Sequence, residues 1–493
     1  MTLGDEVPAK VDVRAKDRPN ILMLFSDEHN ARMCGYAGHP VVRTPNLDRL
    51  AAGGVAFDNA YCNSPLCSPS RQSFMAGLHC HDIGMWNNTA AMPEDTVTWA
   101  HMLSLAGYET SLIGKMHFNG YQKMYGFDRR PVLEGNDRGE SFHSWGLRTS
   151  HVWTDPLPYS GGDQCNGLRQ AGADKPQRCN IFRKDLEVLD FTVQELKRKA
   201  AQPAAQAWAM CASFVLPHPP WKARADILQT YRGRGDLPFN KEGVGRDACD
   251  RWLQQYWGNT MNLPDDVVRA AREVNFALIT EFDEYAGRIL DTLEQTGLAD
   301  NTIVFYFSDH GEMAGEHGMW AKVTLLEASA RVPLAVSWKG RLPAGRRVAT
   351  PVSLVDLYPT FLDVAGVALP EPLYLHGHSL MPLLEGRHKD FAGGEVFCEF
   401  EGEGWNHPRA FLRSGPYKYV HNHTADERLY DLEADPYEMA DLSARPEMGR
   451  TLSRLRRRLL GQWDPEWVER QVRLAQERRK IARCKNVCKD IGW

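Results

Sequence analysis

The chain has 493 residues, of which 43% are apolar and 25% charged, and its formal net charge is -5. A chain of this length can bury a large core divided over two or three domains, and its slightly acidic balance excludes the basic surface on which nucleic-acid-binding proteins rely. Residues 1–19 contain no apolar core of signal-peptide length, and no later run approaches the length of a membrane span. We therefore expect a cytoplasmic protein with neither a nucleic-acid nor a membrane partner.

The chain has eleven cysteines, which is an odd number. Their spacing is not that of a small disulfide scaffold, so we expect reduced thiols. Two pairs, Cys165 with Cys179 and Cys484 with Cys488, could each form a bridge or half of a metal site. No cysteine or histidine cluster completes a tetrahedral site around either pair. Separate free thiols are therefore the preferred interpretation.

In chain order, the first predicted element is a strand over Asn20–Ser26, a continuous apolar run that is followed by Asp27 and Glu28. Such runs are typical of strands that are buried on both faces of a parallel sheet. Carboxylates at the C-terminal edge of such a strand lie where open α/β sheets bind ligands. Asp27 is therefore a candidate ligand, with an ordinary surface loop as the alternative.

The segment Cys67-Ser68-Pro69-Ser70-Arg71 predicts a loop that turns directly into a helix. Cys67 would then lie at the helix N-terminus, where unpaired N–H groups and the helix dipole favour an anion. Arg71 follows one turn later, so its guanidinium could reach the same anion. A buried structural cysteine is the alternative, and the motifs elsewhere in the chain decide between the two.

Two further predicted strands end in polar side chains. The strand over Tyr108–Ile113 is followed by Lys115 and His117, which share one side of an extended segment because alternate residues face the same way. The strand over Ala207–Leu216 is followed by His218, held between prolines that fix the backbone. We expect these three side chains to face a ligand, although an isolated lysine or histidine is usually an ordinary surface residue.

Residues 119–205 form a long stretch without clear periodicity. Long irregular segments of compact domains tend to be functional lids or binding loops, and we expect that role here. The aromatic and histidine side chains of this stretch are more typical of packing than of a substrate cage; they are Phe142, His143, Trp145, His151, Trp153 and Tyr159.

The fourth predicted strand, Asn301–Ser308, carries Asp309 and His310 at its tip. Two carboxylates that converge from different strand tips, here Asp27 and Asp309, together with an imidazole favour a hard divalent cation. A capping aspartate is the alternative for Asp309. Lys322, in the following loop, is a candidate cationic group for the same site, although alone it would be a surface lysine.

Strands alternate with helices as far as about residue 385, and one of these helices is an amphipathic covering helix over 264–296. This pattern predicts an α/β, doubly wound domain with a mainly parallel sheet flanked by helices. Short strands joined by turns follow from residue 395 and predict a smaller C-terminal antiparallel-sheet subdomain. We therefore expect an N-terminal extension (1–19), a catalytic α/β domain (20–385), an antiparallel-sheet subdomain (386–450) and a basic helical tail (451–493).

The helical tail carries leucines at helical spacing and three tryptophans, Trp463, Trp467 and Trp493. An arginine-rich helix is usually a solvated face, but these tryptophans could dock the tail onto a neighbouring subunit. We expect docking, and with it a homo-oligomer.

The chain resembles the formylglycine-dependent sulfatases of the alkaline-phosphatase superfamily over about residues 20–442, because its motifs occur in that family's order. These motifs are Asn20–Glu28, Thr44–Ala51, Cys67–Gly77, Gly114–His117, the His218 loop, Ser308–Gly311, Ser353–Ala365 and Leu429–Leu442. Gly114–Phe118 and Trp320–Lys322 are most similar to the branch that contains choline sulfatases, and Leu216–Pro220 is similar to its phosphonate monoester hydrolase relatives. The resemblance implies that a maturation enzyme oxidises Cys67 to formylglycine.

The resemblance also implies a metal centre. Asp27, Asp309 and His310 match metal-ligand positions of that family, and Glu28 falls where many members carry a second aspartate. Calcium is the implied ion, although a nitrogen ligand leaves magnesium or manganese open. The implied catalytic residues are Cys67, Arg71, Lys115, His117, His218 and Lys322, and the implied metal site comprises Asp27, Glu28, Cys67, Asp309 and His310.

The implied reaction is hydrolysis of a small-molecule or saccharide sulfate monoester to an alcohol and sulfate. One hydroxyl of hydrated formylglycine would attack sulfur, and the other would release sulfate by carbon–oxygen cleavage while His117 accepts its proton. Arg71, Lys115 and Lys322 would stabilise the sulfuryl oxygens, and His218 or Lys322 would protonate the leaving alcohol. A phosphonate or phosphate mono- or diester hydrolase is the alternative, because the motif does not separate tetrahedral oxyanions. A metal-binding scaffold with an unconverted cysteine is a third reading, against which the intact set of cations and imidazoles weighs.

Overall fold

A computed structural model describes most of the chain. The described residues are 18–133, 167–175, 180–202, 206–242, 249–250, 263–402 and 407–487. Among them, no helix combines the length and the apolar character that a membrane span requires. The described cysteines are free thiols, as predicted, whereas the side chains of the two sequence-adjacent pairs lie outside the described residues.

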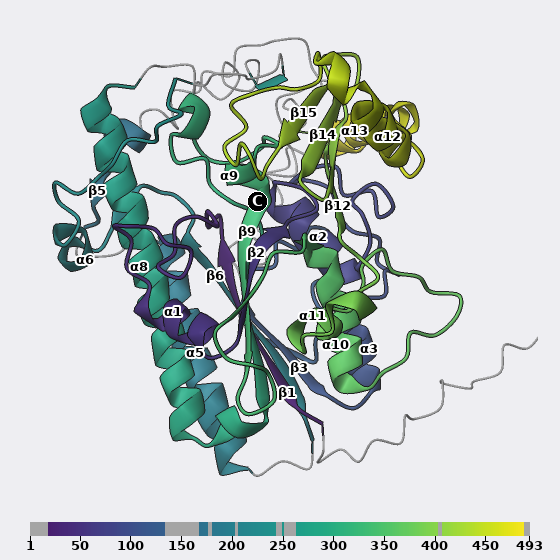
Figure 1. Cartoon of the computed structure of the whole chain (residues 1–493). Helices are drawn as coiled ribbons and strands as arrows, with labels where there is room; N and C mark the ends of the chain where they lie inside the picture. Colours follow the sequence, from purple (N-terminus) through teal and green to yellow (C-terminus); the bar gives the residue numbers. More distant parts are fainter. Residues whose placement is uncertain are drawn as a thin grey trace, which may run out of the picture.

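A nine-stranded sheet runs through the middle of the described part of the molecule (Figure 1). Its strands lie in the order β10 (Arg346–Val348), β2 (Val55–Tyr61), β9 (Arg331–Trp338), β8 (Thr302–Ser308), β1 (Asn20–Asp27), β6 (Trp208–Pro217), β3 (Glu109–Gly114) and β4 (Arg129–Leu133), and β11 (Val352–Ser353) also pairs with β2. Every neighbouring pair is parallel except those that β9 makes with β2 and β8. The predicted mainly parallel α/β sheet is therefore confirmed.

Strand β1 shows why the sequence reads as a continuous apolar run. Ile21, Met23 and Phe25 belong to one apolar core, and Leu22 and Leu24 belong to a second core. Successive side chains of a strand point to opposite faces, so a central strand that is covered on both sides needs apolar residues at every position.

Helices cover both faces of the sheet (Figure 1). One face carries α1 (Pro45–Ala52), α5 (Asn180–Ala201), α6 (Ala225–Gln229) and α8 (Asp265–Gln295), and the other carries α2 (Cys67–Ala76), α3 (Trp99–Leu105), α10 (Leu357–Ala365) and α11 (Met381–Leu384). Shorter elements are β5 (Gly172–Ala173), which pairs with β7 (Lys222–Ala223), the helix α9 (Glu327–Ala330), and the 3-10 turns η4 (Leu298–Asn301), η5 (Glu316–Gly318), η6 (Leu354–Asp356), η7 (His388–Asp390) and η8 (Pro446–Met448). The amphipathic covering helix predicted over 264–296 is α8.

Helix α5 corrects the prediction that 119–205 is irregular throughout. Its apolar side chains recur at helical spacing, and Leu189 and Leu196 are completely buried against the core between α5 and the sheet. Sequence reading missed this helix because charged residues fill the positions between its leucines. The six aromatic and histidine residues singled out within 142–159 lie outside the described residues.

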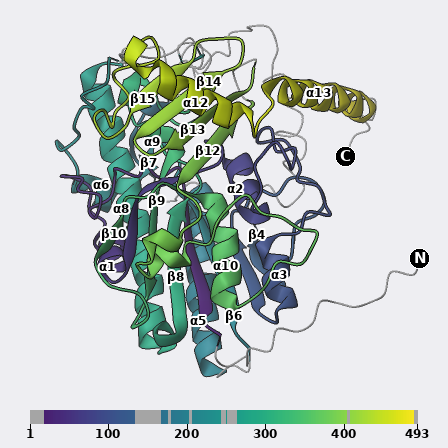
Figure 2. The same cartoon turned by 45° about the vertical axis from the view of Figure 1, so that its right-hand side comes forward.

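The C-terminal subdomain is a four-stranded antiparallel sheet, as predicted. It consists of β12 (Glu395–Phe400), β13 (Arg409–Ser414), β14 (Tyr417–Asn422) and β15 (Arg428–Asp431), followed by α12 (Gly449–Leu460) and α13 (Pro465–Val487). Trp463, between the two helices, is buried with Leu455 and Leu459 against this sheet. This corrects the expectation that Trp463 docks onto a neighbouring subunit; Trp493 lies outside the described residues. Figure 2 shows α13 extending away from the body of the molecule.

A buried ion cluster joins the subdomain to the main domain. The Lys418 ammonium on β14 lies 3.0 Å from a carboxylate oxygen of Glu327 on α9 and 2.8 Å from one of Glu438, and all three side chains are almost wholly buried. Burial alone would disfavour the charged lysine, but Glu438 and Glu327 raise the pKa of Lys418 above its usual value. The cluster is therefore held together by its own compensating charges.

Replacing Lys418 with methionine should lower the free energy of unfolding by about 3 kcal/mol, because it removes the ammonium that pairs with two buried carboxylates. The ion pairs that Glu327 then keeps in the described part of the chain are the longer ones with Arg413 at 3.8 Å and Arg331 at 3.9 Å. Chemical denaturation followed by circular dichroism measures this change. The matched control is Lys339→Met, since Lys339 forms an ion pair with Asp300 on the exposed surface, and its denaturation midpoint should not move. Equal midpoints for both variants and the parent protein would contradict a structural role for the buried cluster.

Candidate active site

The predicted site residues meet at one edge of the main sheet. Asp27 ends β1, Asp309 follows β8, Lys115 follows β3, and His218 follows β6. These strands are parallel to one another, so their carboxyl ends meet at the same edge, where open α/β sheets bind ligands. The first residue of α2, Cys67, lies at this edge too.

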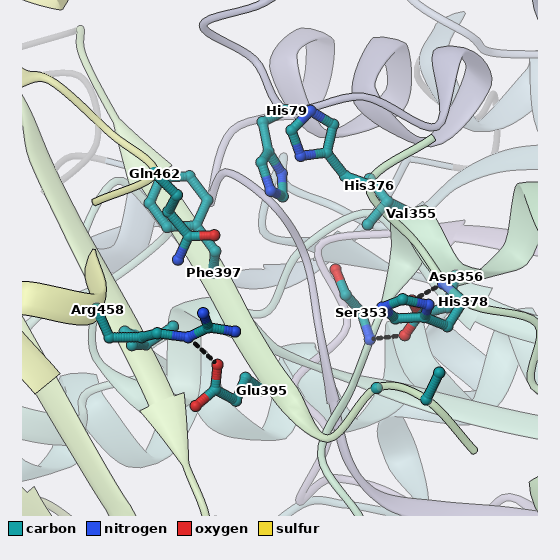
Figure 3. Close-up of a pocket in the computed structure, with 13 residues that line it drawn as sticks. His79, Ser353, Val355, Asp356, His376, His378, Glu395, Phe397, Arg458 and Gln462 are labelled. Atoms are coloured by element: carbon teal, nitrogen blue, oxygen red, sulfur yellow. Dashed lines mark hydrogen bonds and ion pairs between the residues drawn. The ribbon is translucent and has the colours of Figure 1, made fainter. Parts of the chain in front are cut away.

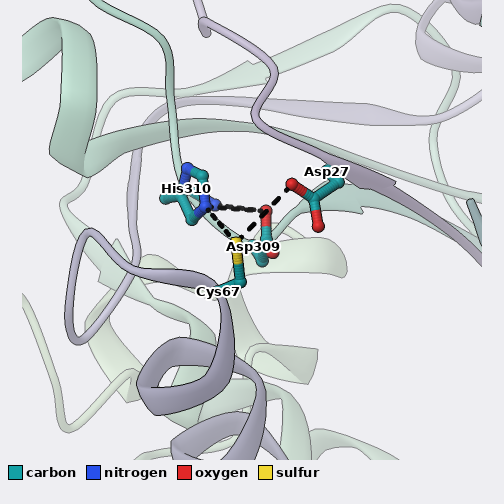
Figure 4. A group of neighbouring side chains, drawn as sticks. All are labelled: Asp27, Cys67, Asp309 and His310. Atoms are coloured by element: carbon teal, nitrogen blue, oxygen red, sulfur yellow. Dashed lines mark hydrogen bonds and ion pairs between the residues drawn. The ribbon is translucent and has the colours of Figure 1, made fainter. Parts of the chain in front are cut away.

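Four buried side chains form the centre of the site (Figure 4). The Cys67 sulfur lies 3.2 Å from His310 Nε2 and 3.8 Å from Asp27 Oδ1, and Asp309 completes the group. Their ligand atoms all lie within 4.8 Å of one another. Two carboxylates and an imidazole beside the group on residue 67 fit a divalent cation, and the nitrogen donor suits magnesium or manganese as well as calcium.

Charge in this cluster also favours a cation. Burial lowers the pKa of a histidine, but Asp309 and the Cys67 sulfur raise the pKa of His310 to about 10. Burial raises the pKa of a thiol, but nearby cations, chiefly Lys115 and Lys322, hold the pKa of Cys67 well below its usual range. These anionic neighbours thus favour a positive charge at this position, either the proton on His310 or a divalent cation that replaces it.

Arg71 lies behind the carboxylates and is completely buried. Its Nε donates to Asp309 Oδ2 at 2.7 Å and its Nη2 donates to Asp27 Oδ2 at 2.9 Å. Its Nη1 donates to the Lys115 carbonyl and to the Ser213 hydroxyl, both at 2.9 Å. These partners direct the guanidinium toward the two carboxylates, and the expected contact with the sulfuryl oxygens stays a prediction.

Lys115 and His117 both lie near the group on residue 67. They follow the end of β3 and are not alternate residues of an extended strand, which corrects the expectation from the sequence. The Lys115 ammonium lies 2.5 Å from Asp27 Oδ2, and the His117 side chain lies near the Cys67 sulfur. His117 has a backbone φ of 59°, which is unusual for a residue other than glycine. The backbone carbonyl of His117 accepts a hydrogen bond from the Ser68 hydroxyl, and this contact links the strained turn to α2.

Glu28, His218 and Lys322 form the other side of the site. Glu28 Oε2 lies 2.6 Å from the Lys322 ammonium and 3.1 Å from His218 Nε2. Burial opposes the ionisation of Glu28, but Lys322 and His218 outweigh it and lower the pKa of the carboxyl group. Glu28 is outside the four-residue cluster, although it forms a second possible ligand group with Asp27 and His218. The closest contacts of Glu28 are therefore with two candidate catalytic residues, Lys322 and His218.

Sequence reasoning missed three residues that support the site. Ser213 binds Arg71, the side-chain amide of Gln72 donates to the Met116 carbonyl at 2.9 Å, and the Asn88 side chain accepts from the backbone N–H of Ser68 at 2.9 Å. Each joins segments that are distant in the sequence, and none belongs to a recognisable spacing. Only the position of Ser213 near the end of a predicted strand gave a signal.

A cavity of about 340 Å³ lies beyond the C-terminal end of α2 (Figure 3). Histidines 79, 376 and 378 line it together with Arg458, which pairs with Glu395 at 2.8 Å. The side chains drawn there come from both the main domain and the C-terminal subdomain. None of the strand-end residues that form the candidate site lines this cavity.

Comparison with known protein families settles the relationship. The family model described as Sulfatase matches residues 19–367, which is more than half of the chain. The chain belongs to the sulfatase family. A second model, described as N-sulphoglucosamine sulphohydrolase, C-terminal, matches residues 315–464 of this sulfatase. The resemblance predicted from the motifs is thus confirmed, and the enzyme is a sulfuric ester hydrolase by family.

Two relatives match nearly the full length of the sulfatase. Choline-sulfatase of Rhizobium meliloti (strain 1021) is 32% identical over 480 residues, which cover 94% of this chain and 90% of that protein. Arylsulfatase K of Bos taurus is 30% identical over 475 residues, which cover 90% of this chain and 82% of that protein.

Solved structures share the fold of the sulfatase. The phosphonate monoester hydrolase of Agrobacterium radiobacter has a TM-score of 0.72 at 23% identity, covering 93% of this chain and 96% of that one. BT4656, solved with its substrate D-glucosamine-2-N,6-O-disulfate, also has a TM-score of 0.72 at 23% identity, covering 92% of this chain and 98% of that one. At 23% sequence identity, the similarity to these structures shows a shared fold alone.

Proposed function

We propose that this sulfatase hydrolyses an organic sulfate monoester to an alcohol and sulfate, with formylglycine at position 67 as the nucleophile and a divalent metal beside it. The observation that carries the proposal is the place of Cys67: it begins a helix, its sulfur lies 3.2 Å from His310 Nε2, and it is grouped with two buried aspartates. A cysteine with a purely structural role does not require two buried carboxylates and an imidazole beside it. Because Cys67 is only 2% exposed, we expect a maturation enzyme to convert it before the chain folds.

Asp27, Asp309 and His310 would hold the metal, with the group on residue 67 as a further ligand. A bound divalent cation would supply Lewis acidity and lower the pKa of a coordinated hydroxyl. Arg71 orients both carboxylates through its direct hydrogen bonds to them. Metal content and activity should therefore depend on Arg71.

In the first half of the reaction, one hydroxyl of the hydrated aldehyde at position 67 would release its proton to water, and its oxygen would attack sulfur as the sulfur–oxygen bond to the alcohol breaks. Lys115 and Lys322 stabilise charge on the sulfuryl oxygens. Burial opposes a charged lysine, but the Cys67 sulfur and Glu28 raise the pKa of Lys322 well above its usual value, so this side chain keeps its proton. We therefore assign protonation of the leaving alcohol to His218, which is 27% exposed and oriented by Glu28.

In the second half, the remaining hydroxyl on the same carbon loses its proton to His117. The aldehyde reforms as the carbon–oxygen bond to the sulfate group breaks, and sulfate leaves. Addition of water to the aldehyde then restores the two hydroxyls. The sum is ester plus water to alcohol plus hydrogen sulfate, which balances without a further reactant.

The similarity to choline-sulfatase and arylsulfatase K supports a sulfate ester as the substrate. Both small sulfated metabolites and sulfated saccharides fit this proposal. Phosphonate and phosphate esters carry the same tetrahedral oxyanion, and the fold shared with phosphonate monoester hydrolases makes them the comparison class for the test.

The proposal is tested by peptide mass spectrometry across residue 67 together with a matched ester panel. The protein is co-expressed with a formylglycine-generating enzyme and assayed with choline sulfate, 4-nitrophenyl sulfate, a glucosamine sulfate and phenylphosphonate esters, each with calcium, magnesium or manganese. We expect a mass loss of about 18 Da at Cys67, the change from thiol to aldehyde, and faster turnover of a sulfate than of its phosphonate counterpart. Cys67→Ala is the control and should release no sulfate.

An unmodified thiol in active protein would overturn the formylglycine mechanism. Faster turnover of phosphonate than of sulfate esters would favour the phosphonate hydrolase alternative. Converted protein that releases neither product in the presence of any of the three metals would contradict both activities.

A further inference from the structure

Lys322 is carried by a loop with unusual backbone geometry. The loop comprises residues 311–323 and follows His310 in the sequence. In space, its last residue contacts the segment before Cys67. On either side of Lys322, Ala321 has a φ of 64° and Val323 a φ of 71°. Left-handed backbone is costly for residues other than glycine, and most of all for a β-branched residue such as valine. Such a conformation persists only where surrounding contacts impose it.

Glu312 supplies contacts that impose this shape. Its Oε1 accepts hydrogen bonds from the backbone N–H of Ala314 at 2.8 Å and from that of Ala321 at 2.6 Å. One carboxylate oxygen thus joins the outgoing and returning arms of the loop. The backbone N–H of Met313 also donates to the Ala321 carbonyl at 2.7 Å, and the side chain of Asn30 donates to the Glu312 carbonyl at 2.7 Å.

The other oxygen of Glu312 faces the active site. Glu312 Oε2 and Glu28 Oε1 are both buried without a hydrogen-bond donor in the described part of the chain, and burial together with the neighbouring Glu28 raises the pKa of Glu312 well above its usual value. Glu28 Oε2 binds the Lys322 ammonium at 2.6 Å. Glu312 therefore contacts both the backbone next to Lys322 and the carboxylate that holds the Lys322 side chain.

Further packing ties the same loop to the rest of the site. Trp320, which is almost fully buried, packs edge-on against Trp221 with ring centroids 5.2 Å apart, and Trp221 follows the His218 turn. The backbone N–H of Val323 donates to the Pro65 carbonyl at 3.2 Å, two residues before Cys67. A displacement of the loop would thus move Lys322 relative to the nucleophile.

We propose that Glu312 is a positioning residue for Lys322: it holds the 311–323 loop in its strained shape by binding the amides of Ala314 and Ala321, and it lies beside Glu28, which binds the Lys322 ammonium. The proposal depends on the proposed function in one respect, namely that Lys322 acts on the ester. Glu312 itself does not touch the substrate.

The test compares Glu312→Ala, Glu312→Asp and Glu312→Gln, each converted at Cys67, with 4-nitrophenyl sulfate as the probe. Alanine should lower kcat and kcat/KM together by about 10²-fold, the cost of roughly 1 Å of misplacement of a catalytic group. Aspartate is one methylene too short to reach both amides, and should lose about tenfold by the same argument. Glutamine should retain activity within about threefold, because its carbonyl accepts from both amides and its amino group donates to Glu28.

A double-mutant cycle and a measurement independent of activity separate positioning from general damage. In a Lys322→Ala background, Glu312→Ala should cost no more than about twofold further, since groups that act through one another are not additive. Hydrogen exchange of the peptide that contains Ala314 and Ala321 should speed up in Glu312→Ala and stay at the parent rate in Glu312→Gln. The matched control is Glu316→Ala in the same loop, whose carboxylate binds Arg32 at 3.0 Å instead; its kcat should stay within about twofold.

An equal loss of activity in Glu312→Gln and Glu312→Ala would overturn the proposal, because the glutamine variant keeps the hydrogen bonds to the amides of Ala314 and Ala321. A full additional loss on top of Lys322→Ala, or unchanged hydrogen exchange in Glu312→Ala, would overturn it too. If the parent protein hydrolyses no ester, the proposed function fails, while hydrogen exchange still decides whether Glu312 holds the loop.

Discussion

Replacing Cys67 with serine should change the sulfatase from an enzyme that turns over into one that reacts once. Serine offers a single hydroxyl, so the sulfated side chain has no second hydroxyl on the same carbon to expel sulfate. Steady-state kcat should fall by at least about 10³-fold, which corresponds to about 4 kcal/mol of barrier. Mass spectrometry of the peptide that contains position 67 should show, after incubation with ester, a gain of about 80 Da, the mass of the transferred sulfuryl group.

Two variants control this result. Cys67→Ala should neither turn over nor gain mass, because it has no nucleophile at that position. Cys211→Ser places the same substitution on a buried thiol of β6, and its kcat should remain within about twofold of the parent value. Continuous turnover by Cys67→Ser at the parent rate would mean that the nucleophile lies elsewhere.

Replacing Asp309 with asparagine should remove both bound metal and activity. Asp309 is completely buried; its Oδ2 accepts from Arg71 Nε at 2.7 Å and its Oδ1 accepts from the backbone N–H of Glu28 at 3.0 Å. The neutral amide keeps the shape but removes one anionic ligand and leaves the Arg71 charge less compensated. We expect kcat/KM to fall by about 10³-fold or more, and elemental analysis of dialysed protein to show less than stoichiometric metal.

The matched control is Asp300→Asn, because Asp300 lies just before the other end of β8 and its side chain is 73% exposed. Metal content and kcat/KM should both match the parent protein. Chelation of the parent protein, followed by return of calcium, magnesium or manganese one at a time, measures the dependence on metal without a substitution. Full activity in chelated protein, or stoichiometric metal in Asp309→Asn, would refute the assignment of the metal site.

The sequence predicted best where chemistry and local pattern coincide. Strand β1 was predictable because a continuous apolar run occurs when both faces of a strand are covered, and Asp27 then lies necessarily at the ligand edge. The helix beginning at Cys67 was predictable from local signals around Pro69. The same argument applies to β8, which ends in Asp309 and His310.

Local pattern misled where tertiary context decides. Helix α5 was missed because charged residues separate its buried leucines. The antiparallel orientation of β9 between β2 and β8 could not be predicted, since a short apolar run carries no information about its direction. Trp463 was assigned to a partner, whereas packing against its own subdomain buries it.

The sequence by itself determined the family, the mainly parallel fold and the residue types of the site, because these depend on short motifs and on periodic apolar patterns. The tertiary structure determined which contacts each of those residues makes. Arg71 binds the carboxylates of Asp309 and Asp27, and Glu312 lies beside Glu28, although the two are 284 positions apart in the sequence. The physical reason is that a buried charge takes its role from the atoms around it, and those atoms come from segments that only the folded chain brings together.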